Sequence, residues 1–160
     1  MEKIALGGGC HWCTEAVFQN LKGVHRVDQG FVASYGEANE FSEAVIIHFN
    51  PAITGLETLI RIHLKTHSSS SNHTMRIKYR SAIYTFSEAQ EEDARKKILD
   101  LSREFPEDLI IKILPFRKFE QSSKRFRNYY SKDPGRPFCR KYIEPKLELI
   151  RREFPSDLNN

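Results

Sequence analysis

The sequence predicts an α+β fold, a ferredoxin-like α/β sandwich in which helices pack on a mainly antiparallel, mixed sheet. Two observations predict it. Apolar runs typical of strands and amphipathic stretches typical of helices recur along the 160 residues. The two kinds of segment do not alternate regularly enough for a doubly wound parallel sheet. The length suits one domain, residues 1–160, with a core of its own.

In the first half of the chain, an apolar run predicts a buried strand over residues 3–8. One apolar face at helical spacing predicts a helix over residues 11–21, which Lys22-Gly23 ends. Three further segments complete this half. They are an alternating strand, a clear strand closed by Asn50-Pro51, and a helix capped by Thr54, over residues 24–34, 42–49 and 56–64 respectively.

In the second half, Ser87 is suited to cap a long charged helix that extends to about residue 105. Glu88 and Glu91 lie near the positive end of its dipole. The remaining strands are predicted at residues 79–86 and 109–114, and the remaining helices at 119–130 and 143–153. Polar, Gly- or Pro-containing stretches predict turns and loops at residues 35–39, 67–74 and 132–137.

Basic residues are concentrated toward the C-terminal end. The chain has 25 Lys and Arg against 21 Asp and Glu, whereas residues 112–152 hold 13 against 4. A basic segment can bind nucleic acid. Here, however, the basic residues are interleaved with aromatic ones at helical spacing, and no nucleic-acid-binding motif is visible. We therefore interpret the segment as a solvated basic face and expect no nucleic acid partner.

Cysteine usage and the N-terminus indicate a reducing compartment. Three cysteines, two of them close together, do not form a typical secreted disulfide framework. The first strand begins within three residues of Met1, so we expect no signal peptide. Because no apolar run is long enough to span a membrane, we expect no membrane partner and a cytoplasmic location.

Residues 7–13, Gly-Gly-Gly-Cys-His-Trp-Cys, carry the clearest chemical signal. Cys10 stands where the first helix begins, and its thiol is exposed to the positive end of the helix dipole. This environment favours the thiolate, which is the form of cysteine that attacks. Cys13 lies three residues later, within disulfide reach on a helical start.

Three interpretations of these cysteines compete. The first is a pair of structural thiols, and the second is a zinc site. The zinc site would combine the three cysteines with one histidine from His63, His67 and His73. The third is thiol redox catalysis, which thioredoxin-type disulfide exchangers also perform. The glycines and the helix start favour redox catalysis, and the spacing is not a standard zinc pattern, so we predict no metal site.

Residues 9–18, Gly-Cys-His-Trp-Cys-Thr-Glu-Ala-Val-Phe, resemble the opening of the peptide methionine sulfoxide reductase A family, which shows Gly-Cys-Phe-Trp-(Gly/Cys)-x-Glu-x-x-Phe. The resemblance continues in order over nearly the whole chain. It includes Leu21-Lys-Gly-Val24, Gly30-Phe31, Glu43-Ala-Val45, Phe49-Asn-Pro51, His67, Tyr-Arg-Ser-Ala-Ile-Tyr at 79–84, Phe119-Glu120, Tyr129-Tyr130 and Phe138-Cys139. The chain is thereby identified as an atypical member of this family.

The resemblance implies reduction of methionine S-sulfoxide, free or in oxidised proteins, in the repair of oxidative damage. Cys10 is expected to attack the sulfoxide sulfur, while Glu43 and Tyr79 protonate and hydrogen-bond the oxygen. The sulfenic acid on Cys10 then forms a disulfide with a resolving cysteine, Cys13 or Cys139, and thioredoxin opens that disulfide. We expect a monomer with no cofactor other than this external dithiol.

The expected substrate site departs from the family pattern. Trp12 supplies an aromatic wall for the substrate methyl group. His11 stands beside it where the family usually has Phe, and Phe31 stands where Tyr is usual. The segment after Gly30 is short and leaves Tyr35 as the candidate second tyrosine at the sulfoxide oxygen.

The loop before Tyr79 also departs from the pattern. It lacks the acidic residue expected to hold the substrate backbone and carries Arg76 and Lys78 instead. We expect these departures to alter substrate choice. The alternative function is a related thiol- or metal-binding protein without reductase activity.

Overall fold

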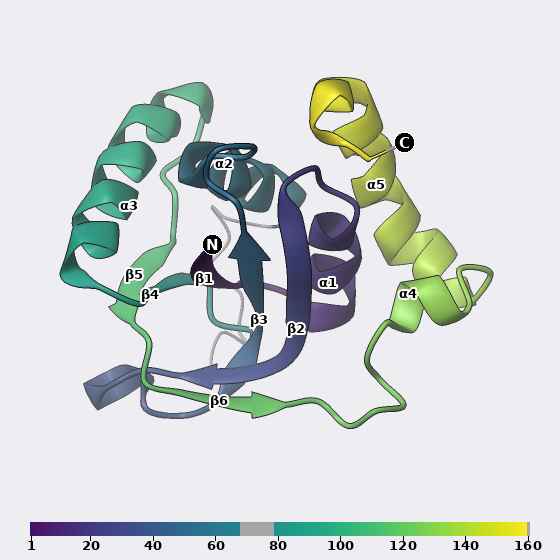
Figure 1. Ribbon diagram of the computed structural model, residues 1–160, viewed down its shortest axis with the longest axis horizontal. Helices are drawn as coiled ribbons and strands as arrows, with labels where there is room; N and C mark the ends of the chain where they lie inside the picture. Colours follow the sequence, from purple (N-terminus) through teal and green to yellow (C-terminus); the bar gives the residue numbers. More distant parts are fainter. Residues whose placement is uncertain (68–78, 160) are drawn as a thin grey trace.

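The computed structural model describes residues 1–67 and 79–159, and within them helices pack against a six-stranded sheet (Figure 1). The strands are β1 (Glu2–Gly7), β2 (Val24–Ala33), β3 (Ser42–Phe49), β4 (Ala82–Thr85), β5 (Lys112–Pro115) and β6 (Lys118–Gln121). The α-helices are α1 (His11–Gln19), α2 (Leu56–Thr66), α3 (Glu88–Leu101), α4 (Tyr129–Lys132) and α5 (Glu144–Glu153).

The sheet is built around a β1-α1-β2-β3-α2-β4 unit. Its strands lie in the order β4-β1-β3-β2, and every neighbouring pair among them is antiparallel. This is the ferredoxin-like arrangement. At the two edges, β5 pairs parallel with β4 and β6 pairs antiparallel with β2. The predicted α+β fold with a mainly antiparallel, mixed sheet is therefore confirmed.

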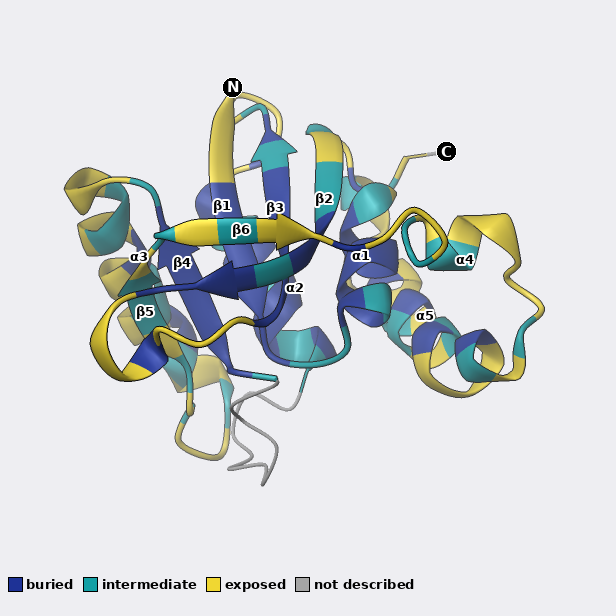
Figure 2. Ribbon diagram, turned by 90° about the horizontal axis from the view of Figure 1, so that it is seen from below, coloured by how far each residue is buried: buried dark blue, intermediate teal, exposed yellow. Residues whose placement is uncertain are grey.

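The two faces of the sheet bury separate hydrophobic clusters, because successive side chains of a strand point to opposite faces. Ile4, Leu6 and Ile47 belong to the larger cluster, with buried residues of α1, α2 and α5. Ala5 and Tyr84 belong to the smaller cluster on the other face. Figure 2 shows the central strands as largely buried. Helix α1 contacts β2, β3 and α5, so the cysteine-bearing helix is held from two sides.

The predicted helix over residues 119–130 is wrong. Its beginning forms β6, and only Tyr129–Lys132 is α-helical (α4). The aromatic spacing of the segment fits a helix, but the edge of β2 offers backbone hydrogen bonds along residues 30–33. Phe119 also packs into the smaller hydrophobic cluster. Tertiary pairing therefore overrides the local pattern.

Three smaller expectations also differ from the structure. Strand β4 begins at Ala82 rather than at residue 79, and β5 begins at Lys112 rather than at residue 109. Gly55 replaces Thr54 as the N-cap of α2. The capping role of Ser87 is confirmed, because its Oγ accepts the N–H of Gln90 at 3.1 Å. The expected loop at residues 67–74, with His73, lies outside the described residues from position 68 onward.

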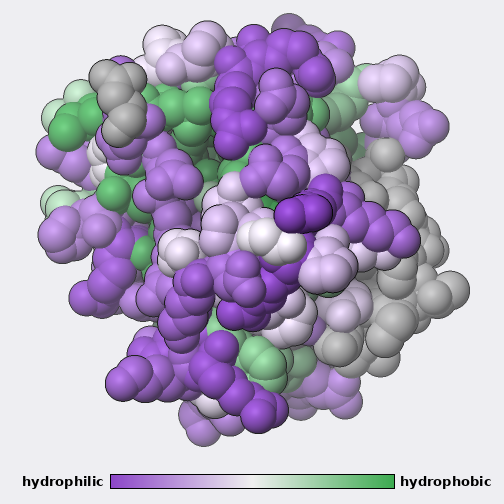
Figure 3. Space-filling view, turned by 90° about the vertical axis from the view of Figure 1, so that its right-hand side faces the viewer, coloured by the Kyte–Doolittle hydropathy of each residue, from purple (hydrophilic) through white to green (hydrophobic). Residues whose placement is uncertain are grey.

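The side of the molecule that carries α4 and α5 is largely hydrophilic (Figure 3). Some of its basic groups lie on aromatic rings, as with the guanidinium of Arg136, 4.1 Å from the ring centroid of Tyr129. These contacts agree with a solvated basic face. In the described part of the chain, none of the helices has the length and apolar character needed to cross a bilayer.

Candidate active site

The turn between β1 and α1 sets the position of the first cysteine. Gly8 has φ +153°, and a Cβ there would lie 2.5 Å from the ring of His67, so the site needs glycine. Cys10 is the N-cap of α1, with extended backbone angles, and its carbonyl accepts the N–H groups of Cys13 and Thr14. Its sulfur therefore stands at the N-terminus of α1, as the sequence predicted.

A cavity of about 380 Å³ opens beside Cys10. Its lining includes six of the predicted site residues, namely Cys10, His11, Trp12, Phe31, Glu43 and Tyr79. Sequence reasoning did not assign the remaining lining residues Ser122, Ser123, Phe126 and Phe138. Three of these four lie in the segment that was predicted to be helical, and the wrong secondary structure hid their common orientation.

Tyr35 is the predicted substrate-binding residue that does not line this cavity. Its side chain is 60% exposed, and the guanidinium of Arg117 lies 5.8 Å from its ring centroid. The short segment between β2 and β3 turns outward through a 3₁₀ turn at Gly36–Ala38. The expectation that Tyr35 reaches the substrate is therefore not met in this structure.

Neighbouring strands and a buried arginine position the two expected oxygen-binding groups. Glu43 lies on β3 opposite Phe31 of β2 and is 6% exposed. Arg80 follows Tyr79 directly. Its N–H donates to Ser42 Oγ at 2.7 Å, and its guanidinium donates to the hydroxyl of Tyr84. These bonds fix the backbone next to Tyr79.

The aromatic wall is larger than the sequence indicated. Trp12 stacks on Tyr129 with ring centroids 4.0 Å apart. The rings of Trp12 and Phe138 meet edge to face, with centroids 5.2 Å apart. Phe126 is 5.7 Å away. Stacking of this kind adds to simple area burial. Residues from the C-terminal third therefore complete a wall that begins on α1.

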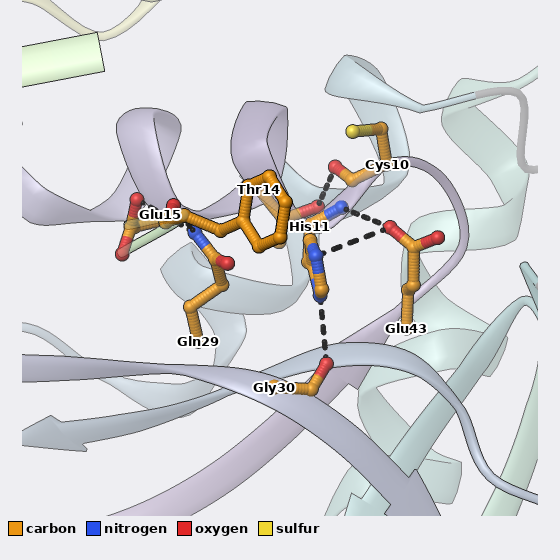
Figure 4. Close-up of polar contacts among 8 residues, drawn as sticks. Cys10, His11, Thr14, Glu15, Gln29, Gly30 and Glu43 are labelled. Atoms are coloured by element: carbon orange, nitrogen blue, oxygen red, sulfur yellow. Dashed lines mark hydrogen bonds and ion pairs between the residues drawn. The ribbon is translucent and has the colours of Figure 1, made fainter. Parts of the chain in front are cut away.

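A buried carboxylate attaches that C-terminal segment to α1. Glu15 is 2% exposed and accepts the Nε2 group of Gln29 at 2.9 Å (Figure 4). It also accepts the backbone N–H groups of Asn128 and Tyr129 at 3.0 and 3.2 Å. Burial raises the pKa of Glu15, while these hydrogen bonds oppose that shift. The motif at residues 9–18 contains this glutamate, so the motif is the sequence signal that could have revealed the attachment of the C-terminal segment to α1.

The thiols of Cys10 and Cys13 form a hydrogen-bonded pair. The shared hydrogen bond raises the pKa of Cys10, as does burial, and it lowers the pKa of Cys13. The negative charge of Glu43 also raises the Cys10 pKa, whereas the Trp12 backbone N–H lowers it. Cys10 and Cys13 therefore ionise as a coupled pair that shares one proton across this hydrogen bond, and the sequence-based assignment of the thiolate to Cys10 alone is replaced by that pair.

Behind the sulfurs lies a second, smaller cavity of about 40 Å³, which Cys10, Cys13, His67 and Lys146 help to line. Lys146 comes from α5, and its ammonium group donates to the carbonyl of Thr66. Burial lowers the pKa of Lys146, and the nearby thiolates raise it. In return, its positive charge lowers the pKa of Cys13.

We expect Lys146→Met to raise the pH at which the thiol pair becomes reactive, by about one pH unit, because the substitution removes a cation beside the Cys13 thiolate. The measurement is the rate of iodoacetamide alkylation against pH, with the modified cysteine located by mass spectrometry. Lys141→Met removes an exposed cation one turn away and should leave the profile unchanged. Equal profiles for all three proteins would contradict this assignment.

Cys139 is buried and separated from solvent. It is 0% exposed, and its Sγ lies 3.6 Å from the carbonyl oxygen of Asp133. Burial raises its pKa. It shares the larger hydrophobic cluster with Cys13, so both predicted resolving cysteines lie on the α1 side of the sheet.

The histidines of the zinc interpretation have other partners. His63 Nε2 lies 2.8 Å from the carbonyl oxygen of Gly7, and His67 bonds the His63 carbonyl and Ser81 Oγ. Among residues 1–67 and 79–159, no group of three or more His, Cys, Asp and Glu side chains is arranged to hold a metal. The third histidine, His73, lies outside these ranges, as do Arg76 and Lys78.

A poised thiol pair, a buried carboxyl group and an aromatic wall around one cavity suit the reduction of a small sulfur-containing group. Comparison with known proteins agrees. The sequence model of the family described as "Peptide methionine sulfoxide reductase" matches residues 2–158. The chain belongs to the peptide methionine sulfoxide reductase family. The predicted activity, reduction of methionine sulfoxide by an oxidoreductase, is thereby confirmed.

Relatives of the reductase match along its whole length. "Peptide methionine sulfoxide reductase MsrA" of Chromobacterium violaceum is 32% identical over 176 aligned positions, covering 100% of both chains. Mxr1 from Saccharomyces cerevisiae in reduced form has a TM-score of 0.73 at 19% identity, covering 86% of this chain and 88% of Mxr1. Mxr1 in complex with Trx2 has a TM-score of 0.63 at 18% identity, covering 78% and 83%. The two solved structures show that the fold is shared.

Proposed function

We propose that this reductase converts the S epimer of methionine sulfoxide, free or within oxidised proteins, to methionine, with Cys10 as the nucleophile. One observation carries the assignment of Cys10. Among the cysteines, Cys10 alone lines the larger cavity, with Glu43 and Tyr79, and it also borders the smaller cavity beside Cys13. Its sulfur can therefore meet a substrate on one side and a resolving thiol on the other.

In the first step, Cys10 passes its proton across the shared hydrogen bond to the Cys13 thiolate. The Cys10 sulfur then attacks the sulfoxide sulfur, while Glu43 protonates the oxygen and Tyr79 donates a hydrogen bond to it. The oxygen moves to Cys10. The products are methionine and a sulfenic acid, so the substrate sulfur is reduced and the Cys10 sulfur is oxidised.

In the second step, Cys13 is the first resolving residue because it already contacts Cys10. Its sulfur bonds to the Cys10 sulfur, and the hydroxyl group leaves as water with one proton. Cys139 is a later relay, since it is buried in the same cluster. A thioredoxin returns two electrons and no resident cofactor takes part. The solved complex of Mxr1 with Trx2 supports this partner. We further propose that the protein acts as a monomer in the reducing cytoplasm.

The larger cavity also offers groups for the substrate backbone. Within the described residues, Ser122 Oγ is buried without a hydrogen-bond partner, and so is Trp12 Nε1. Both residues line the cavity. Buried polar atoms of native proteins normally find a partner. We propose that a methionine sulfoxide residue and its peptide groups supply it.

The proposed function is tested with both epimers of a methionine sulfoxide peptide and dithiothreitol as reductant. We expect multiple turnovers with the S epimer and none with the R epimer. Thioredoxin with its own reductase should replace dithiothreitol. Turnover of the R epimer alone, or of neither epimer by folded protein, would rule out the proposal.

A further inference from the structure

His11 is held in a single tautomer by β2. The residue is 6% exposed, and its Nδ1 lies 2.8 Å from the carbonyl oxygen of Gly30 (Figure 4). A carbonyl oxygen only accepts hydrogen bonds, so Nδ1 must carry a proton. The ring of Phe31 lies at 5.1 Å in an edge contact and fixes the orientation further. The other ring nitrogen, Nε2, is thereby left to face β3.

Glu43 stands opposite that nitrogen. Its Oε1 lies 3.4 Å from His11 Nε2 and accepts the His11 backbone N–H at 3.2 Å. Since Nδ1 is already protonated, one further proton belongs to the contact between Nε2 and Oε1. Either it resides on the imidazole, which gives an imidazolium and a carboxylate, or it resides on the carboxyl group, which then donates to a neutral imidazole.

Among the described residues, few other titratable or charged groups lie near this contact. The remaining titratable groups among the described lining residues of the larger cavity are Cys10 and Tyr79. From β2, His11 meets a carbonyl and an aromatic ring, neither of which titrates. The guanidinium of Arg80, next to Tyr79, is directed to Tyr84. Lys146 lines the smaller cavity with the two thiols and is not among the residues that line the larger one.

We propose that His11 and Glu43 form a proton-sharing pair, in which His11 is a positioning residue that stores the proton Glu43 delivers to the sulfoxide oxygen. This rests on the proposed function. The one shared proton passes from the imidazole Nε2 through the Glu43 carboxyl group to the oxygen as the Cys10 thiolate attacks sulfur, which leaves a neutral imidazole and a carboxylate. The substrate sulfur gains two electrons, the Cys10 sulfur loses two, and the neutral imidazole regains its proton from solvent.

The pair gives a reason for the main departure of this sequence from the family pattern. A phenylalanine at position 11, as in the family pattern, would make this part of the pocket wall apolar and could hold no proton beside the Glu43 carboxyl group. With His11 the pocket wall itself holds a proton. Imidazole ordinarily releases its proton near pH 6.5, and a glutamic acid near 4.3. The pair therefore keeps a transferable proton at a higher pH than the carboxyl group alone.

The first experiment follows the imidazole nitrogens of His11 by NMR as pH is changed, in the intact protein and in Glu43→Gln. We expect Nδ1 to stay protonated throughout. The titration midpoint should fall by at least about one pH unit in Glu43→Gln, because an opposite charge within 4 Å is lost. Glu120→Gln changes an exposed carboxylate on β6 and should not move the midpoint. The same midpoint in Glu43→Gln as in the intact protein overturns the proposal.

The NMR readout needs no turnover, so it separates failure of this proposal from failure of the reductase assignment. The second experiment measures single-turnover sulfoxide reduction against pH in His11→Phe, with folding checked by near-ultraviolet circular dichroism. In this variant, the alkaline limb of the curve of rate against pH should move to lower pH by at least about one unit. A limb that stays in place, or moves to higher pH, shows that His11 is only part of the wall.

Discussion

The Cys10→Ser variant is expected to form no methionine from the sulfoxide, a loss on the order of 10⁴-fold or more in single-turnover rate. A serine hydroxyl is not ionised near neutral pH and cannot carry the oxygen as a sulfenic acid. Serine preserves the size and the N-cap position, so α1 should remain folded. The measurement is methionine released per protein chain in a single mixing experiment, without added reductant.

Cys13→Ser is the matched comparison for Cys10→Ser. It removes a sulfur of the same pair but leaves the nucleophile in the cavity. We expect about one equivalent of methionine from this variant, formed slowly because the proton acceptor for Cys10 is lost, and no Cys10–Cys13 disulfide. One equivalent from Cys10→Ser and none from Cys13→Ser would reverse the roles of the two cysteines.

The fold around the site was predictable because its signals are local. The strand that ends in glycines, the helix behind it and the clear strand over residues 42–49 each depend on a run of adjacent side chains. Antiparallel pairing of β2 with β3 then follows from their short connection, whereas β1 and β3 pair across the intervening α1 and β2. The segment after residue 115 lacks such a signal, since its aromatic spacing fits a helix and only the open edge of β2 selects a strand.

The candidate site was predictable to a similar extent. The nucleophile, the acid and the aromatic wall are found by motif, whereas contacts between distant segments are not. Lys146 reaches the thiols only through the packing of α5, and the Glu15 attachment depends on a left-handed backbone turn at Asn128, with φ 56°. The prediction for Tyr35 did not hold for a related reason. Tyr35 is close to the site residues in sequence, but sequence proximity does not determine the direction in which its turn points.

The Glu43→Gln variant is expected to lose about 10²- to 10⁴-fold in the rate of the first chemical step, the range that a positioned general acid contributes. The amide oxygen can still accept the His11 backbone N–H, so the geometry of the pocket is retained while the transferable proton is removed. The rate is measured by rapid quenching and quantification of methionine. Glu120→Gln, on the exposed face of β6, serves as the control and should match the intact protein.

The result of Glu43→Gln also decides which group protonates the sulfoxide oxygen. If the variant retains more than about a tenth of the rate, the carboxyl group is not the acid, and the hydroxyl of Tyr79, the other expected oxygen-binding group of the cavity, becomes the candidate acid. Tyr79→Phe would then show the larger loss. If Glu43 is the acid, Tyr79→Phe should cost only the strength of one hydrogen bond, about tenfold, and the two losses differ by at least one order of magnitude.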